Sequence, residues 1–237
     1  EEADVVIYAD SLVNPKVCRY AQASAEVYGS SSLTLEEITG LMVNAVRQGK
    51  MVARVHTGDP SIFGALQEQM AVLDRHGITY EVVPGVSSIF AAAAALGREL
   101  TVPQLSQTVI ITRLEGRTPV PPKERLSSLA EHNATLVLFL SVAMIDAVVS
   151  QLLEGGYVAS TPVAVVQRAS WEDERIVRGT LADIAAKVRD AGIESQALIL
   201  VGAALGQDLE ASDEGQRSKL YDKGFSHKYR KKRDGGD

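Results

Sequence analysis

The sequence predicts an α/β protein with two α/β domains, the first containing a mostly parallel sheet and the second a mixed sheet. Three observations favour this class. Short apolar runs alternate with amphipathic helical stretches through the first half of the chain. Two glycine-containing turns each follow an apolar run and precede an apolar helix. A second series of apolar runs and helices then follows a loop rich in proline and arginine. Strands that alternate with helices at this spacing are typical of a mostly parallel sheet covered on both faces.

The first domain is expected over residues 1–105. Thr34 and Glu37 have the spacing of a capping box, which predicts where its first helix begins. Its predicted strands are residues 5–8, 51–55 and 80–83, and its predicted helices are residues 34–47, 62–73 and 89–96.

The second domain is expected over residues 106–205. A short strand at 172–177 would make its sheet mixed, and Thr180 is a plausible N-cap for the last helix. Its other predicted strands are residues 107–112, 135–140, 163–167 and 197–201, with helices at 143–153 and 181–189. Residues 206–237 form a tail that is acidic first and basic later, either a solvated terminus or an arm that binds anions or contacts a second subunit.

The two glycine turns are the most informative features for function. They are His56-Thr57-Gly58-Asp59-Pro60 and Pro84-Gly85-Val86-Ser87-Ser88. In open α/β sheets, ligands bind outside the carboxyl ends of the strands, where these turns are predicted. Glycine there lets the backbone approach a ligand closely. The sequence therefore predicts a pocket lined largely by backbone, in a crevice between the two domains.

Composition narrows the class of protein. A net charge of −6 argues against a general nucleic-acid binder. The single cysteine, Cys18, excludes an intrachain disulfide framework and suits a reducing cytosol. No stretch approaches the ~20 apolar residues of a membrane span, and no signal peptide is visible. No Ser-His-Asp arrangement, metal-ligand cluster or phosphate-binding loop stands out, so no catalytic residue and no metal are predicted.

The chain resembles the tetrapyrrole methylase family, whose members bind S-adenosylmethionine in the cleft between two α/β domains. The family's shared pattern is similar to Gly58-Asp59-Pro60, to residues 84–88 and to the closing run at 197–202. Three longer stretches resemble the cobalamin-pathway branch that methylates precorrin-4, or its cobalt form, at C-11. These stretches are residues 54–60, 112–119 and 217–222.

The resemblance implies several further expectations. A cytoplasmic homodimer that methylates a polycarboxylate macrocycle is expected, with S-adenosylmethionine as cofactor. The family opens with a strand and a glycine-rich Gly-x-Gly-Pro-Gly-Asp loop, which the visible residues lack. Residues 4–8 resemble the family's second strand, so an additional strand and loop are expected before residue 1.

The resemblance also implies a cofactor site. Thr57, Gly58 and Asp59 would lie against the amino-acid part of the cofactor, with Ile62 one turn later. Ser87 and Ser88 would contact it as well, and Leu140, Ala169 and Ala197 would surround the adenine. Each position has a structural alternative. Asp59, Ser87 and Ser88 could cap helices, and the three apolar residues could be ordinary core.

Basic residues near these turns are candidates for the substrate carboxylates. Arginine binds carboxylates through paired charge-assisted hydrogen bonds. The candidates are His56, Arg113, Arg117, Lys123 and Arg168, each of which could instead be a surface charge or, for His56, a half-buried imidazole. Trp171 is a candidate platform for the macrocycle or a packed loop residue.

Three other functions stay open at this point. Asp10 follows a strand much as the ribose-binding acid of a nicotinamide dehydrogenase does, although no Gly-x-Gly-x-x-Gly precedes it. A non-catalytic corrinoid-binding protein is the second alternative. The third is methylation of another tetrapyrrole carbon. Methyl transfer needs little acid or base chemistry, because a sulfonium methyl group is already activated and positioning can lower most of the barrier.

Overall fold

The computed structural model describes residues 1–206, 220 and 224–231. These residues fall into two compact units, with the division between Ala91 and Ala92 inside helix α3 (Ser88–Leu96). The expected junction near Leu105 lies in the second unit. Most of the charged tail, including most of the 217–222 stretch, lies outside the described residues.

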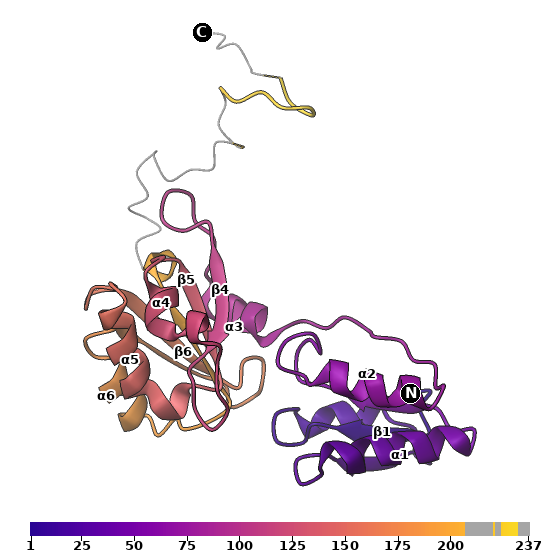
Figure 1. Ribbon diagram of the computed structural model, residues 1–237. Helices are drawn as coiled ribbons and strands as arrows, with labels where there is room; N and C mark the ends of the chain where they lie inside the picture. The colour runs from indigo at the N-terminus through magenta and orange to yellow at the C-terminus, as the bar shows by residue number, and fades with distance from the viewer. Residues whose placement is uncertain (207–219, 221–223, 232–237) are drawn as a thin grey trace. The chain divides into compact units, whose positions relative to one another are not determined.

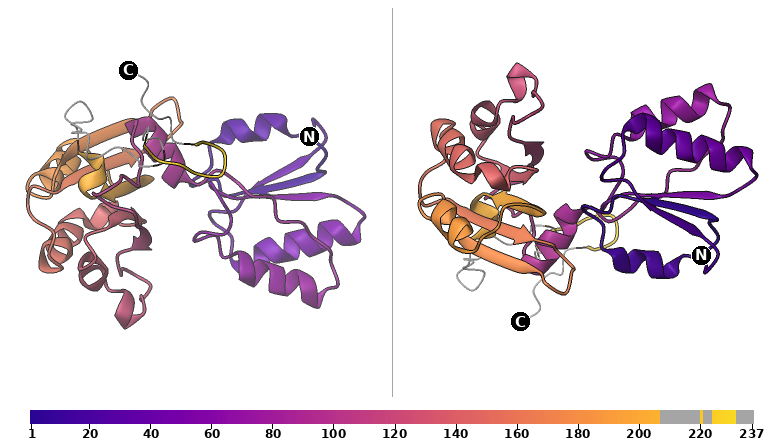
Figure 2. Two further views of the ribbon diagram at one scale, coloured as in Figure 1. Left: turned by 90° about the horizontal axis from the view of Figure 1, so that it is seen from above. Right: turned by 90° about the horizontal axis from the view of Figure 1, so that it is seen from below.

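The first unit contains a parallel sheet with strand order β2-β1-β3 (Figure 1). Helices α1 and α2 pack side by side on one side of it, as Figure 2 shows. Val5 and Ile7 of β1 point to that side, where they form a core with Met42 of α1 and Leu73 of α2. The elements are β1 (Val5–Tyr8), η1 (Pro15–Tyr20), β2 (Glu26–Gly29), α1 (Leu35–Arg47), β3 (Val52–Val55) and α2 (Leu66–Arg75).

The capping box at the start of α1 is confirmed. The Thr34 hydroxyl accepts a hydrogen bond from the Glu37 N–H at 3.2 Å, and the Glu37 carboxylate accepts one from the Thr34 N–H at 2.7 Å. These two bonds satisfy backbone donors that a helix leaves free at its first turn. The helix ends at Arg47, the predicted boundary.

Two predictions for the first unit are wrong. Residues 80–83 do not form the predicted strand, because within the described residues β3 pairs only with β1 and offers this segment no neighbour. Helix α2 begins at Leu66 rather than Ile62, because Phe63 and Ala65 adopt left-handed backbone angles that no helix allows. Strand β2 was not predicted. It lies at a sheet edge, and its partly exposed residues give no apolar run.

The second unit contains the mixed sheet that the sequence predicts, with strand order β4-β5-β8-β6-β7. Strands β4 and β5 are parallel, whereas β8 runs antiparallel to both β5 and β6. Its elements are β4 (Val109–Arg113), η2 (Pro122–Glu124), α4 (Leu126–Ala130), β5 (Thr135–Phe139), η3 (Val142–Met144), α5 (Ile145–Glu154), β6 (Pro162–Gln167), β7 (Arg175–Thr180), α6 (Ile184–Asp190), β8 (Ala197–Val201) and η4 (Ala203–Leu205).

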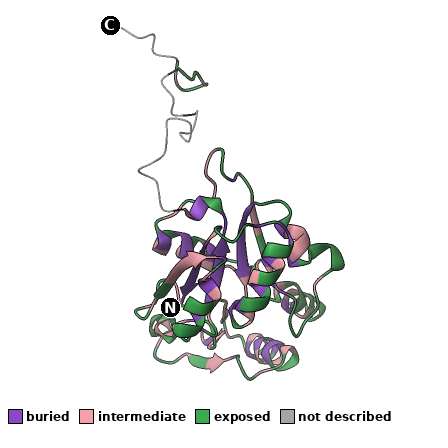
Figure 3. Ribbon diagram, turned by 90° about the vertical axis from the view of Figure 1, so that its left-hand side faces the viewer, coloured by how far each residue is buried: buried purple, intermediate pink, exposed green. Residues whose placement is uncertain are grey.

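Buried residues concentrate on the central strands of this sheet (Figure 3). One face packs against α4, α5 and α6, with Leu138, Val165 and Ile199 of the strands fully buried in that core. The prediction that Thr180 is the N-cap of α6 is wrong. Thr180 is the last residue of β7. Its N–H donates to the Asp183 carboxylate at 2.8 Å, and α6 starts only after Asp183.

Candidate functional site

The two glycine turns lie against each other in the first unit. Gly58, which has a φ of +64°, is packed so closely that a Cβ there would lie 3.1 Å from the Ser88 nitrogen. A Cβ on Gly85 would lie 2.0 Å from the Gly58 carbonyl oxygen. Only glycine allows two backbones to approach this closely. The structure therefore brings together Thr57, Gly58 and Asp59 from one predicted turn and Ser87 and Ser88 from the other.

Asp59 holds this arrangement together. One carboxylate oxygen accepts the Gly85 N–H at 2.8 Å, and the other accepts the Ser61 N–H at 2.9 Å. The bond from Gly85, and then that from Ser61, lowers the pKa of the Asp59 carboxyl below its usual value. Asp59 precedes a turn rather than a helix, so its partners are the N–H groups of the two turns.

The other cofactor candidates in this unit differ in exposure. Thr57 and Gly58 are exposed, so their hydroxyl and backbone groups can reach a ligand. Ile62 and Ser88 are half-buried. Ser87 is buried, and its hydroxyl accepts a hydrogen bond from the Ile89 N–H at 3.4 Å, which makes it the cap of α3.

His56 lies directly before the first turn and is half-buried. Its Nε2 atom is buried without a hydrogen-bond partner in the described part of the chain. Burial, and then the charge of Arg54, lowers the pKa of His56 below its usual 6.5. The imidazole is therefore neutral at neutral pH.

This pKa shift gives a stability prediction. Because the folded state binds the His56 proton less readily than the unfolded state, His56 destabilises the fold as the pH falls through 6.5 and has no such effect well above it. His56→Gln should remove that part of the pH dependence. Urea unfolding of both proteins between pH 5 and 8 measures it. A wild-type minus variant difference that stays constant with pH would contradict the prediction.

In the second unit, three apolar cofactor candidates lie at one end of the sheet. Gln167, the last residue of β6, pairs with Ala197, the first residue of β8. Leu140 directly follows β5, whose Leu138 pairs with Ile199 of β8. Leu140 and Ala169, which follow the carboxyl ends of β5 and β6, thus lie at the same sheet end as Ala197.

The backbone at this end is strained at residues other than glycine. Leu140, Arg168, Ser170 and Gln196 all have φ between +50° and +70°. Such residues persist only where the surroundings fix them, and they concentrate at functional sites. Leu140 is also 62% exposed, unusual for a leucine directly after a buried strand. These features favour a ligand-contacting edge here.

Two of the predicted substrate-binding arginines are engaged within the protein. Arg113 donates to the carbonyls of Thr118 and Pro119, at 3.1 and 2.7 Å, and so holds the loop after β4. Arg168 bonds to Gln196 and pairs with Asp173, and its guanidinium lies 5.4 Å from the centre of the Trp171 ring. Arg117 and Lys123 are exposed, and within the described residues neither forms a hydrogen bond or ion pair.

Sequence reasoning missed two residues that shape this edge. Ser141 is fully buried, and its hydroxyl accepts the Leu114 N–H at 2.8 Å, which ties the loop after β4 to the end of β5. Gln196 accepts from Arg168 through its side chain, while its backbone carbonyl accepts the Arg168 N–H at 2.9 Å. The sequence signal that could have indicated them is a polar residue close to the end of a buried strand, Ser141 after β5 and Gln196 before β8.

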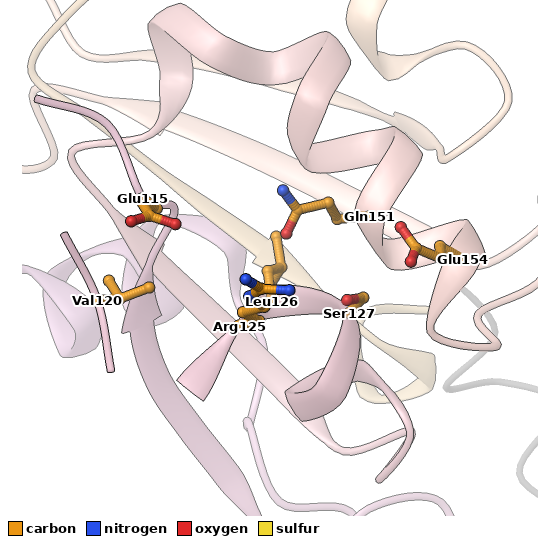
Figure 4. Close-up of a pocket in the computed structure, with 7 residues that line it drawn as sticks. All are labelled: Glu115, Val120, Arg125, Leu126, Ser127, Gln151 and Glu154. Atoms are coloured by element: carbon orange, nitrogen blue, oxygen red, sulfur yellow. The ribbon is translucent and has the colours of Figure 1, made fainter. Parts of the chain in front are cut away.

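A pocket of about 220 Å³ lies elsewhere in the second unit, between the loop after β4 and helices α4 and α5 (Figure 4). None of the predicted site residues lines it. Its walls are Glu115, Val120, Arg125, Leu126, Ser127, Gln151 and Glu154. Among the described residues, no group of His, Cys, Asp and Glu could hold a metal ion, and none of the helices combines the length and the apolar composition of a membrane-spanning segment.

The fold and these turns define a class: α/β proteins in which two glycine turns pack against each other in the unit that holds a parallel sheet, and in which a second unit holds a mixed sheet. Residues 1–185 match the family model for tetrapyrrole (corrin/porphyrin) methylases. The chain belongs to that family.

Several named relatives are similar over most of the chain. The cobalt-precorrin-4 C(11)-methyltransferase of Methanocaldococcus jannaschii is 59% identical over 98% of this chain and 87% of its own length. The precorrin-4 C(11)-methyltransferase of Mycobacterium tuberculosis (strain H37Rv) is 50% identical over 86% of this chain and 82% of its own.

Solved structures agree with this assignment. The crystal structure of the cobalamin biosynthetic enzyme cobalt precorrin-4 methyltransferase, CbiF, has a TM-score of 0.84 at 51% identity and 86% coverage of both chains. The uroporphyrin-III C-methyltransferase of Thermus thermophilus, solved with S-adenosylhomocysteine, has a TM-score of 0.69 at 31% identity. That match covers 86% of this chain and 87% of the other.

Proposed function

We propose that this protein is an S-adenosylmethionine-dependent C-methyltransferase that acts on precorrin-4, or cobalt-precorrin-4, at C-11 in cobalamin biosynthesis. The observation that carries the proposal is the pair of turns joined through Asp59, in a chain 50–59% identical to relatives with that named activity. Asp10, the residue that suggested a dehydrogenase, instead accepts hydrogen bonds at 2.7 Å from the backbone and hydroxyl of Ser31.

The residues present suit the cofactor. The exposed Thr57 hydroxyl and the exposed backbone groups of Gly58 suit the polar amino-acid part of the cofactor. Leu140 exposes an apolar side chain that suits the adenine. We propose that Thr57, Gly58 and Asp59 bind the amino-acid part, that Ile62, Ser87 and Ser88 also contact the cofactor, and that Leu140, Ala169 and Ala197 contact the adenine. When bound, S-adenosylmethionine supplies an activated methyl group. The role of the chain is to hold the reacting groups at near-attack geometry.

The decisive experiment is methyl transfer from S-adenosylmethionine carrying a ¹³C-labelled methyl group. Incubation with cobalt-precorrin-4 or precorrin-4 should place the label at C-11, as read by NMR of the isolated product. Label at another ring carbon would support the alternative of a different tetrapyrrole specificity. Binding of the macrocycle and S-adenosylhomocysteine without transfer would support a non-catalytic corrinoid-binding protein.

Substrate recognition gives a second test. His56, Arg113, Arg117, Lys123 and Arg168 remain proposed contacts of the macrocycle. Because Arg117 and Lys123 are the two without partners in the described residues, Arg117→Ala and Lys123→Ala should each raise the KM for the macrocycle by roughly tenfold, the loss of one charged contact. S-adenosylhomocysteine affinity, measured by calorimetry, should stay within about twofold. Equal losses for both ligands would mean that these side chains act on the fold instead.

We further propose that the protein works in the cytoplasm as a homodimer. A single cysteine, half-buried in the structure, supports a reducing compartment. Sedimentation equilibrium of the purified chain tests the oligomeric state, and a monomer at micromolar concentration would contradict the dimer.

A further inference from the structure

The turn between β3 and α2 holds an unusual backbone conformation. Phe63 and Ala65 have φ values of 54° and 49°, a region that residues other than glycine rarely adopt. Gly64 lies between them, and a Cβ there would lie 2.3 Å from the Pro60 carbonyl oxygen and 3.3 Å from Nδ1 of His56. Such a conformation persists only when neighbouring groups fix it.

The side chain of Gln69 is the neighbour that fixes this turn. Gln69 lies on the first part of α2 and is only 4% exposed. Its amide nitrogen donates to the carbonyls of Gly64 and Ala65, at 3.3 and 3.2 Å. Both carbonyls belong to the strained segment, so the amide closes the turn onto the helix that follows it.

Gln69 is in turn anchored to the central sheet. Its amide oxygen accepts the Arg54 Nε–H at 3.2 Å, and Nη1 of Arg54 donates to the carbonyls of Ile7 and Val55, at 3.1 and 3.2 Å. Arg54 is half-buried and, among the described residues, pairs with no carboxylate. The Arg54 guanidinium therefore links β1 and β3 to Gln69 through hydrogen bonds. The connection runs from the sheet through Arg54 and Gln69 to the turn.

This turn continues directly from the residues proposed to bind the cofactor. Thr57, Gly58 and Asp59 precede it, and Ile62 lies within it. We propose that Gln69 is a positioning residue for the cofactor, because it holds the 57–65 segment in its strained conformation before the ligand arrives. The proposal rests on the function proposed above. In it, the amide N–H group of Gln69 fixes the turn, and Arg54 orients that amide.

Two variants at Gln69 separate the possible roles. Gln69→Leu removes both the donor and the acceptor. Gln69→Glu keeps an acceptor for Arg54 but loses the donor to Gly64 and Ala65. Both should weaken S-adenosylhomocysteine binding by about tenfold in calorimetry, the effect of losing a preorganised contact. The KM for S-adenosylmethionine should rise, whereas kcat and the KM for the macrocycle should not change.

A matched control lies on α1 in the same unit. Thr39 is equally buried, and its hydroxyl donates to the Leu35 carbonyl at 2.8 Å, away from the turn. Thr39→Val should lower the melting temperature somewhat and leave ligand affinity within twofold. Hydrogen exchange gives a readout that needs no ligand, because amides of residues 60–65 should exchange faster in both Gln69 variants than in Thr39→Val.

The possible outcomes are distinct. Wild-type affinity and unchanged exchange in Gln69→Glu would overturn the proposal and leave Gln69 as a mere partner of Arg54. If Gln69→Leu does not fold, Gln69→Glu alone decides through the same two measurements. If the full-length wild-type protein fails to bind S-adenosylhomocysteine, the proposed function is wrong, while faster exchange at 60–65 would still support the role of Gln69 in fixing the turn.

Discussion

Gly85→Ala is expected to weaken S-adenosylhomocysteine binding by about 100-fold. The new Cβ would lie 2.0 Å from the Gly58 carbonyl oxygen and 3.0 Å from its carbonyl carbon. Both contacts are with backbone, so no side-chain rotation relieves them and the two turns must separate. Overpacking of this kind costs roughly 3 kcal/mol, and about 1.4 kcal/mol corresponds to a tenfold change in affinity. Separation also breaks the 2.8 Å bond from the Gly85 N–H to Asp59.

Gly40→Ala is the matched control for this variant. Gly40 lies in α1, its φ is not positive, and a Cβ there would meet nothing within 4 Å. Alanine in a helix interior should stabilise the unit by roughly 0.5–1 kcal/mol and leave ligand affinity unchanged. Calorimetry and thermal unfolding of both variants give the comparison. Wild-type affinity in Gly85→Ala would show that contact between the turns does not matter for binding.

Leu140→Gly is expected to stabilise the second unit while it weakens cofactor binding. Leu140 has a φ of 51°, which glycine adopts without strain, so the substitution should recover roughly 1 kcal/mol. The same change removes the exposed side chain proposed to cover the adenine. Losing the burial of one leucine corresponds to about 1.5–3 kcal/mol, or roughly a 10- to 100-fold loss of affinity. Stability and affinity should therefore move in opposite directions.

Asn133→Gly provides the reference for that prediction. Asn133 has a similar φ of 48° and is exposed, but it lies before β5, away from the strand end that carries Leu140. Its replacement should raise the melting temperature without changing affinity for S-adenosylhomocysteine. If Leu140→Gly also leaves affinity unchanged, Leu140 does not contact the adenine, and the strained backbone at this sheet end needs another explanation.

Local sequence patterns determined much of the fold. The capping box of Thr34 and Glu37 set the start of α1, because both of its hydrogen bonds form within four residues. The apolar runs at β1 and β8 form buried strands, since a short, fully apolar segment is typical of a strand that is buried on both faces. The two glycine turns predicted a close approach of backbone to a ligand, which stays a prediction, whereas the structure shows a close approach of the two turns to each other.

The tertiary structure decided what depends on partners distant in the sequence. Residues 80–83 have the composition of a strand, but a strand also needs a neighbour, and the described sheet offers none at that position. Arg113 and Arg168 carry the charge that carboxylates need, yet their donors are occupied by loop carbonyls, Gln196 and Asp173. Asp59 illustrates the same limit, because its partner Gly85 lies 26 residues away. Composition and hydrophobic periodicity are local properties of the sequence, whereas hydrogen bonds between distant residues form only when the whole unit packs.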